Sequence, residues 1–292
     1  MRKQFAKTVE DLMAQDERLV LLLGDIGVFG FRNAFKMYPE RTYNIGICEQ
    51  AMTSVAAGLA KEGLIPVLHS IAPFIVERAF EQIKVDFGYQ GLGGNFVSVG
   101  GSYDYAGLGC THHCPSDVAL LKTIPDFQVI VPGSAQDFDV LFRALYSSSK
   151  PTYFRLSEFP HTLSVACRAF HAAVVRQGES GTLLAVGPLL DRAVDACADL
   201  DVTVLYYTTL APFDAATLAA NCPTHRVAVV APFYEGTLSY DIQQALCGRP
   251  VEVLDLGVPR RFLTSYGRAA EHDTEYGLAV EQLRQRLREF FS

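Results

Sequence analysis

The chain has 292 residues, of which 49% are hydrophobic and 20% charged, enough to form one large or two medium globular domains. A net charge of -7 gives no general attraction to nucleic acid or to an anionic membrane, so we expect neither as a partner. Charges run through the N-terminal segment, no apolar run approaches about 18 residues, and the seven cysteines are scattered. These features predict a cytoplasmic protein with reduced thiols, without a membrane span or a secretory signal.

The first 160 residues alternate short apolar runs with amphipathic stretches. The chain opens with "FAKTVEDLM", which places Phe5, Val9 and Leu12 on one face of a helix. Alternation of this kind predicts an α/β fold with a mostly parallel sheet flanked by helices, in which binding sites form at the carboxyl ends of strands. The expected strands are 19–25, 64–70, 95–101, 127–133 and 151–157, and the expected helices lie near 49–62, 74–88, 115–123 and 135–147.

A second α/β domain is expected after a change in character near residue 160. Residues 161–180 show no clean period and are interpreted as a connection. The domain prediction is therefore 1–160, a connection at 161–180, and a smaller domain at 181–292. The expected strands of the second domain are 181–187, 202–207, 226–232 and 251–257, with helices near 188–199, 214–221, 237–247 and 275–290.

The segment "YNIGICEQAMTSVAAGLAKEG" places Glu49 where a strand, expected to be buried, runs into an Ala-rich helix with little polarity nearby. A carboxylate loses solvation there and is usually paired or partly protonated, which indicates chemistry or a specific partner. The alternative is a carboxylate that interacts only with the dipole at the helix start.

The segment "CTHHC" brings Cys110, His112, His113 and Cys114 within five residues. A zinc site is not favoured, because adjacent histidines seldom converge on one tetrahedral ion and no second pair of ligands follows. The alternative is that a helix starting at Pro115 presents both imidazoles to a cleft, where they could hydrogen-bond a substrate and move protons. "GDIGVFGF" lacks the G-x-G start of a dinucleotide fingerprint, so a tight strand-to-helix turn is preferred there.

These segments occur in a set order: "GDIG", "NIGICEQAMTSVAAGLA", "FIVERAFEQI", "GLGCTHHCPSDVALLKTIPDFQVIVPG", and then "TTLAPFD" and "GVPRRFLTSYG". Nearly the whole chain thereby resembles the C-terminal half of transketolases, a pyrimidine-binding domain followed by a C-terminal domain. The resemblance implies thiamine diphosphate as cofactor and Glu49 as the residue that contacts the ring nitrogen of its aminopyrimidine. It also implies further site residues: Phe74 stacking on the pyrimidine, Ile47 at the cofactor, His112 bonding substrate, and His69, His113 and Tyr105 as weaker substrate candidates.

The family's diphosphate-and-magnesium motif has no counterpart in this sequence. The resemblance therefore implies that no metal is held by this chain, and that a separate N-terminal-type subunit holds the diphosphate and Mg²⁺ in an α2β2 assembly. Tyr105 and Glu158 stand where family members that act on sugar phosphates usually carry an arginine, and the nearby Arg155 should point to the opposite face of its strand from its neighbours.

The predicted function is transfer of a two-carbon ketol unit from a ketose-type donor to an aldehyde acceptor, which need not be an ordinary sugar phosphate. Two alternatives stay open at this point. One is the beta subunit of a 2-oxo acid dehydrogenase, and the other is a scaffold subunit without catalytic activity.

Overall fold

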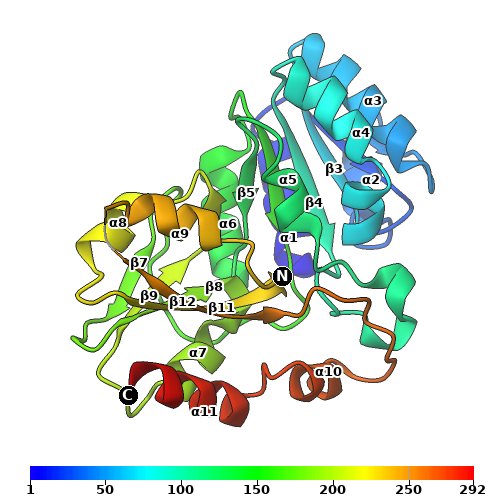
Figure 1. Cartoon of the computed structure of the whole chain (residues 1–292). Helices are drawn as coiled ribbons and strands as arrows, with labels where there is room; N and C mark the ends of the chain where they lie inside the picture. Colours follow the sequence, from blue (N-terminus) through cyan, green and yellow to red (C-terminus); the bar gives the residue numbers. More distant parts are fainter. Residues whose placement is uncertain (249) are drawn as a thin grey trace.

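The computed structural model describes residues 1–248 and 250–292, which fold around two β-sheets (Figure 1). The first sheet has the strand order β10-β5-β6-β4-β3-β1-β2. Its neighbouring strands pair in parallel except β10, which runs antiparallel to β5 at the edge. The strands are β1 (Leu19–Leu23), β2 (Thr42–Asn44), β3 (Ile65–Ile71), β4 (Gly94–Val99), β5 (Gln128–Ile130), β6 (Pro151–Arg155) and β10 (Thr209–Ala211).

Both faces of the first sheet are covered by helices, which explains why its strands are apolar throughout. In β1, Leu19 and Leu21 pack with helices α1 and α6, while Val20 and Leu22 pack with α3, α5 and the π-helical turns. The helices of this half are α1 (Arg2–Met13), α2 (Arg32–Met37), α3 (Glu49–Lys61), α4 (Phe80–Gln82), α5 (Asp117–Leu121) and α6 (Ala135–Leu145), with π-helical turns at Pro73–Glu77 and Ile83–Tyr89.

The second sheet has the strand order β12-β11-β8-β9-β7, parallel except for β7, which runs antiparallel to β9. Helices α7, α10 and α11 pack against one face, and α8 and α9 cover the other. The elements are β7 (Ala173–Arg176), β8 (Thr182–Val186), β9 (Thr203–Tyr207), β11 (Arg226–Tyr234), β12 (Glu252–Val258), α7 (Leu190–Ala196), α8 (Ala215–Ala220), α9 (Ser239–Ala245), α10 (Ala269–Glu275) and α11 (Val280–Phe291).

The two sheets are not independent. One hydrophobic cluster runs from α3 and α5 of the first half to α8 and α9 of the second. Strand β10, from the second half, completes the first sheet, and β7 lies inside the stretch that the sequence indicated as a connection. These edge strands are short and antiparallel, which a search for alternating strands and helices does not reveal.

Other differences from the sequence prediction have local causes. The predicted helix at 275–290 is wrong at its start, because Gly277 has a positive φ of 74° and separates α10 from α11. The helix expected near 74–88 is divided into π-helical turns around the short α4. The predicted class, α/β with two mostly parallel sheets flanked by helices, is confirmed.

None of the described helices is both long and apolar enough to cross a membrane. Among the described residues, no group of three or more His, Cys, Asp and Glu side chains is placed to hold a metal ion.

Candidate functional site

Glu49 is the first residue of α3, and its side chain is completely buried beside the carboxyl ends of β1 and β3. Ser70 donates from Oγ to Glu49 Oε1 at 2.9 Å, and Arg78 donates from Nη1 to Oε2 at 2.8 Å. Gly24, directly after β1, leaves room for this pair, because a Cβ there would lie 3.2 Å from Ser70 Oγ and 3.4 Å from Glu49 Oε1. The carboxylate is thus held on both oxygens in a water-free place, beside the helix N-terminus.

Two sequence expectations about this segment are wrong. The strand before Glu49 is not buried: β2 is an edge strand, and Tyr43 and Asn44 on it are exposed. The surroundings of Glu49 are not of low polarity either, since Arg78 forms an ion pair with it. Arg78 lies 29 residues further along the chain, so only the tertiary fold reveals this partner.

Phe74 and His112 lie next to this ion pair. The Arg78 guanidinium carbon is 4.2 Å from the centre of the Phe74 ring, and the Phe74 and His112 rings meet edge to face with centres 5.2 Å apart. Phe74 and Arg78 come from the π-helical turn and its C-terminal flank, and His112 comes from the loop at 106–114, which we call the histidine loop. The structure therefore brings Glu49, Phe74 and His112 together, as one continuous set of contacts through Arg78.

His112 is partly exposed, and its Nδ1 is 3.0 Å from Thr111 Oγ1. Ile47, two residues before Glu49, is 66% exposed. Both side chains are therefore accessible to a ligand, whereas the Glu49 carboxylate lies beneath the surface.

His69 is not available to a ligand. Its side chain is 1% exposed, its Nδ1 donates to the carbonyl oxygen of Val97 at 2.8 Å, and its ring packs edge to face against Phe5. Burial lowers the pKa of His69 from 6.5 to about 4, so the imidazole is neutral at physiological pH. His69 points to the opposite face of β3 from Ser70, which explains why one of these neighbours reaches Glu49 and the other does not.

The expectation that both histidines of the histidine loop face a cleft is wrong for His113. Its side chain is buried, and its ring meets His272 of α10 edge to face at 5.3 Å. Tyr103 stacks on the other side of His272. Burial lowers the pKa of His113, and its place between the two halves of the chain indicates a role in packing.

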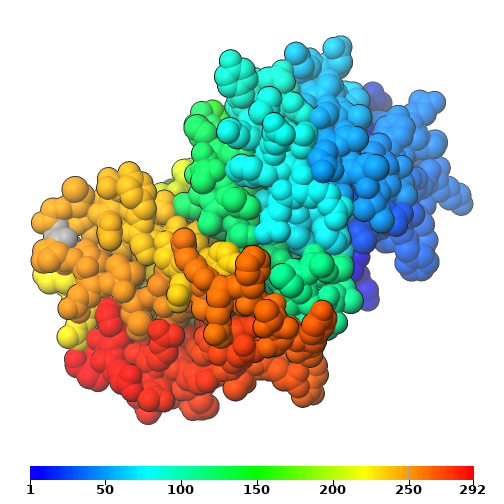
Figure 2. Space-filling model, turned by 45° about the vertical axis from the view of Figure 1, so that its right-hand side comes forward, coloured from blue at the N-terminus to red at the C-terminus, as the bar shows by residue number. Residues whose placement is uncertain are grey.

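The loop of the second half at 259–267 lies against the histidine loop, as Figure 2 shows for the orange segment beside the blue-green one. A Cβ on Gly109 would fall 2.4 Å from the Tyr266 ring, and the backbone of Gly109 has a positive φ of 74°. This close approach requires glycine at position 109. The second half thus supports the loop that carries His112.

Tyr105 and Glu158, which replace arginines in the resemblance, contact each other. Tyr105 donates from its hydroxyl to Glu158 Oε1 at 3.2 Å, and burial with nearby acidic groups raises the pKa of Tyr105 to about 12. Beside them, Asp104 accepts hydrogen bonds from the Glu158 backbone N at 2.9 Å and from Ser157, and burial raises its pKa to about 7. Sequence reasoning missed Asp104, because its proximity to Glu158 depends on β4 and β6 being neighbours.

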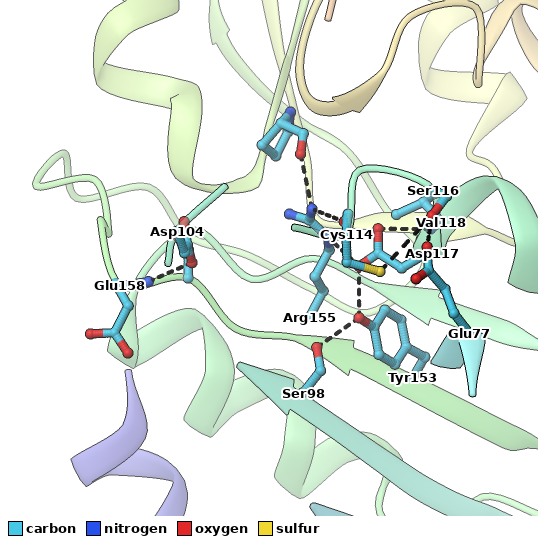
Figure 3. Close-up of polar contacts among 12 residues, drawn as sticks. Glu77, Ser98, Asp104, Cys114, Ser116, Asp117, Val118, Tyr153, Arg155 and Glu158 are labelled. Carbon is cyan, nitrogen blue, oxygen red and sulfur yellow. Dashed lines mark hydrogen bonds and ion pairs between the residues drawn. The ribbon is translucent and has the colours of Figure 1, made fainter. Parts of the chain in front are cut away.

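Arg155 does not serve a substrate either, since it belongs to the buried network in Figure 3. Its side chain is 2% exposed, and its Nε donates to Asp117 Oδ2 at 2.7 Å. Tyr153 donates to the same oxygen at 2.7 Å, and Arg155 Nη2 donates to the carbonyl oxygen of Pro232 on β11 at 2.9 Å. The network joins β6, the end of the histidine loop and the second sheet.

Comparisons with known proteins agree with this geometry. A family model described as "Transketolase, pyrimidine binding domain" matches residues 1–159. The chain is 37% identical to an "Uncharacterized 33.6 kDa protein in fasciation locus" of Rhodococcoides fascians, over 98% of this chain and 93% of that one. It is 28% identical to a subunit of the apulose-4-phosphate transketolase of Phocaeicola vulgatus, over 99% and 96%.

Among solved structures, "Split gene transketolase, inactive beta4 tetramer" superposes with a TM-score of 0.86 at 25% identity, covering 99% of this chain and 97% of that one. The agreement extends over both sheets, so it includes the second half as well as the half that carries Glu49. This chain therefore belongs to the transketolase family, as a subunit that corresponds to the family's C-terminal part and begins with the pyrimidine-binding domain.

Proposed function

We propose that this chain is the C-terminal-type subunit of a two-chain, thiamine-diphosphate-dependent transketolase. It would transfer a two-carbon ketol unit from a ketose-type donor to an aldehyde acceptor in the cytoplasm. An N-terminal-type subunit would hold the diphosphate and Mg²⁺, and two copies of each chain would form an α2β2 assembly. The names of two relatives support a split enzyme, because one is a single subunit of a transketolase and the other is a split-gene transketolase.

The observation that carries this proposal is the buried Glu49 carboxylate with the Phe74 ring beside it. The residues fit the aminopyrimidine end of the cofactor: a carboxylate for a ring nitrogen and an aromatic face for a planar heterocycle. The described part of the chain has no cluster of acidic side chains that could hold Mg²⁺, which is consistent with a metal held by another chain.

In this proposal Glu49 accepts the hydrogen bond of the pyrimidine ring nitrogen and can share a proton with it. Phe74 orients the ring by stacking, and Ile47 adds an apolar contact at the surface. When bound, the cofactor supplies a nucleophilic carbon and an electron sink. His112, exposed next to Phe74, donates a hydrogen bond to a substrate hydroxyl or carbonyl oxygen and holds it in place.

The two alternatives are not favoured by these relatives. A beta subunit of a 2-oxo acid dehydrogenase would be expected to resemble dehydrogenases, whereas the relatives reported above with a functional name are transketolases. A scaffold subunit would have no need for a completely buried carboxylate beside a solvent-facing histidine, because such a group costs desolvation energy.

The test is calorimetric titration of thiamine diphosphate and Mg²⁺ into this chain alone and into its complex with an N-terminal-type subunit. We expect binding in the complex and, for Glu49→Gln, a loss of ketol transfer of about 10²-fold or more, a typical effect of removing an acid–base group. Glu62→Gln, at the other end of α3, is exposed and serves as the matched control. Near-normal turnover of Glu49→Gln in a stable complex would refute the assignment.

A further inference from the structure

Access to Glu49 is controlled by one side chain. Its Oε1 faces Ser70 and Gly24, both completely or largely enclosed, so no ligand can approach from there. Its Oε2 faces Arg78, whose side chain is 36% exposed. The side of the carboxylate that a ligand could reach from solvent is therefore the side that the guanidinium already covers.

The same guanidinium also covers Phe74. It lies 4.2 Å from the centre of that ring, within the range of a cation–π contact. A guanidinium and an aminopyrimidine are both planar, both donate N–H groups to a carboxylate, and both stack on an aromatic face. One side chain thus makes the two contacts that the proposed function assigns to the pyrimidine ring.

The neighbouring acid does not hold Arg78 in another place. Glu77 accepts a hydrogen bond from Ser116 Oγ at the end of the histidine loop. Arg78 is thus left to pair with Glu49, and this pairing gives the buried carboxylate a counter-charge when no ligand is present.

We propose that Arg78 occupies the pyrimidine position of the free chain and must leave it before the cofactor binds. This inference rests on the proposed function. It assigns to Arg78 a positioning role: the side chain keeps Glu49 paired and Phe74 covered until a ring displaces it toward solvent. Cofactor affinity is then lower than the contacts with Glu49 and Phe74 alone would provide, because the Arg78 contacts are lost in exchange.

The first test uses the free chain and the probe 4-amino-2,5-dimethylpyrimidine, which is the pyrimidine half of the cofactor. Arg78→Met keeps the alkyl stem and removes the competing guanidinium, so we expect it to bind the probe about tenfold more tightly than wild type, a change of about 1.4 kcal/mol. Arg32→Met is the matched control, because the Arg32 guanidinium lies 4.6 Å over the exposed Phe29 ring, and it should bind as wild type does. Equal or weaker binding by Arg78→Met would overturn the inference.

A second measurement does not depend on the folding of a variant that leaves Glu49 unpaired. In wild type, phenylglyoxal modification of Arg78, followed by peptide mass spectrometry, should speed up several-fold when the probe is added, with Arg32 as the internal reference. A slower reaction of Arg78 would show that the ring binds over the arginine instead of displacing it, and an unchanged rate would show that it does not move. Either result overturns the inference.

The two proposals fail in different ways. If the assembled complex binds thiamine diphosphate through Glu49 but Arg78→Met gains no affinity, the displacement inference is wrong and the proposed function stands. If neither the chain nor the complex binds the cofactor, the proposed function is wrong, and the inference falls with it.

Discussion

Breaking the Asp117–Arg155 ion pair should destabilise the protein far more than breaking a surface pair of the same length. Asp117→Asn leaves the Arg155 guanidinium without its counter-charge, at a place where the two side chains are 0% and 2% exposed. Removing one partner of a buried pair typically costs about 3–5 kcal/mol, since the remaining charge is neither hydrated nor paired. Arg155 would keep only carbonyl partners, Pro232 and Cys114.

The control is Asp199→Asn, which breaks the pair between Arg288 and Asp199. Its shortest N–O distance is also 2.7 Å, but the two side chains are 55% and 49% exposed. Water and salt screen such a pair, so its loss should leave the unfolding midpoint unchanged. The comparison holds distance constant and varies burial alone.

The assay is urea unfolding followed by circular dichroism, with the double variant Asp117→Asn/Arg155→Met included. Removing both charges should recover most of the lost stability, because a buried pair is often replaceable by apolar packing at little net cost. The reasoning would be refuted if Asp117→Asn shifted the midpoint no more than Asp199→Asn, or if the double variant were as unstable as the single one.

Three further predictions follow from the site. Because the pKa of His69 is lowered from 6.5 to about 4, the unfolded chain binds a proton that the folded chain does not, so acidification from pH 6.5 to 4 should remove about 3 kcal/mol of stability; His69→Asn, which retains an N–H for Val97, should flatten that dependence in unfolding experiments. Asp104 behaves in the opposite sense: its pKa is raised from 3.8 to about 7, so it costs stability as pH rises through that range. Asp104→Asn should therefore be more stable than wild type at pH 8, by on the order of 1–2 kcal/mol after discounting for partial exposure, with no advantage at pH 4. Finally, His112→Asn should lower turnover or raise the substrate KM by about 10²-fold, whereas titrated cofactor affinity should stay close to wild type; a loss confined to cofactor affinity would reassign His112.

Much of the first half was predictable because its signals are local. Completely apolar strands such as 19–23, alternating with amphipathic helices, are typical of a parallel sheet covered on both faces. A carboxylate at the start of an Ala-rich helix marked Glu49 as unusual. The histidine loop marked His112, although its sequence did not distinguish His112 from His113.

The distinction between the histidines required the tertiary structure. Adjacent residues on an irregular loop point in different directions, and packing of α10 against the loop buried His113 while leaving His112 near Phe74. His69 was a reasonable candidate by its place near a strand end. Its side chain nevertheless points to the core face, where Phe5 of α1 encloses it.

The sequence by itself determined the fold class, the order of most elements, and the family to which the motifs belong, because these depend on periodicity and on short contiguous segments. The tertiary structure alone decided which charges meet: Glu49 with Arg78, Arg155 with Asp117, and Tyr105 with Glu158. These pairs join residues 29, 38 and 53 positions apart, and their energies depend on burial that arises only when the helices and both sheets have packed.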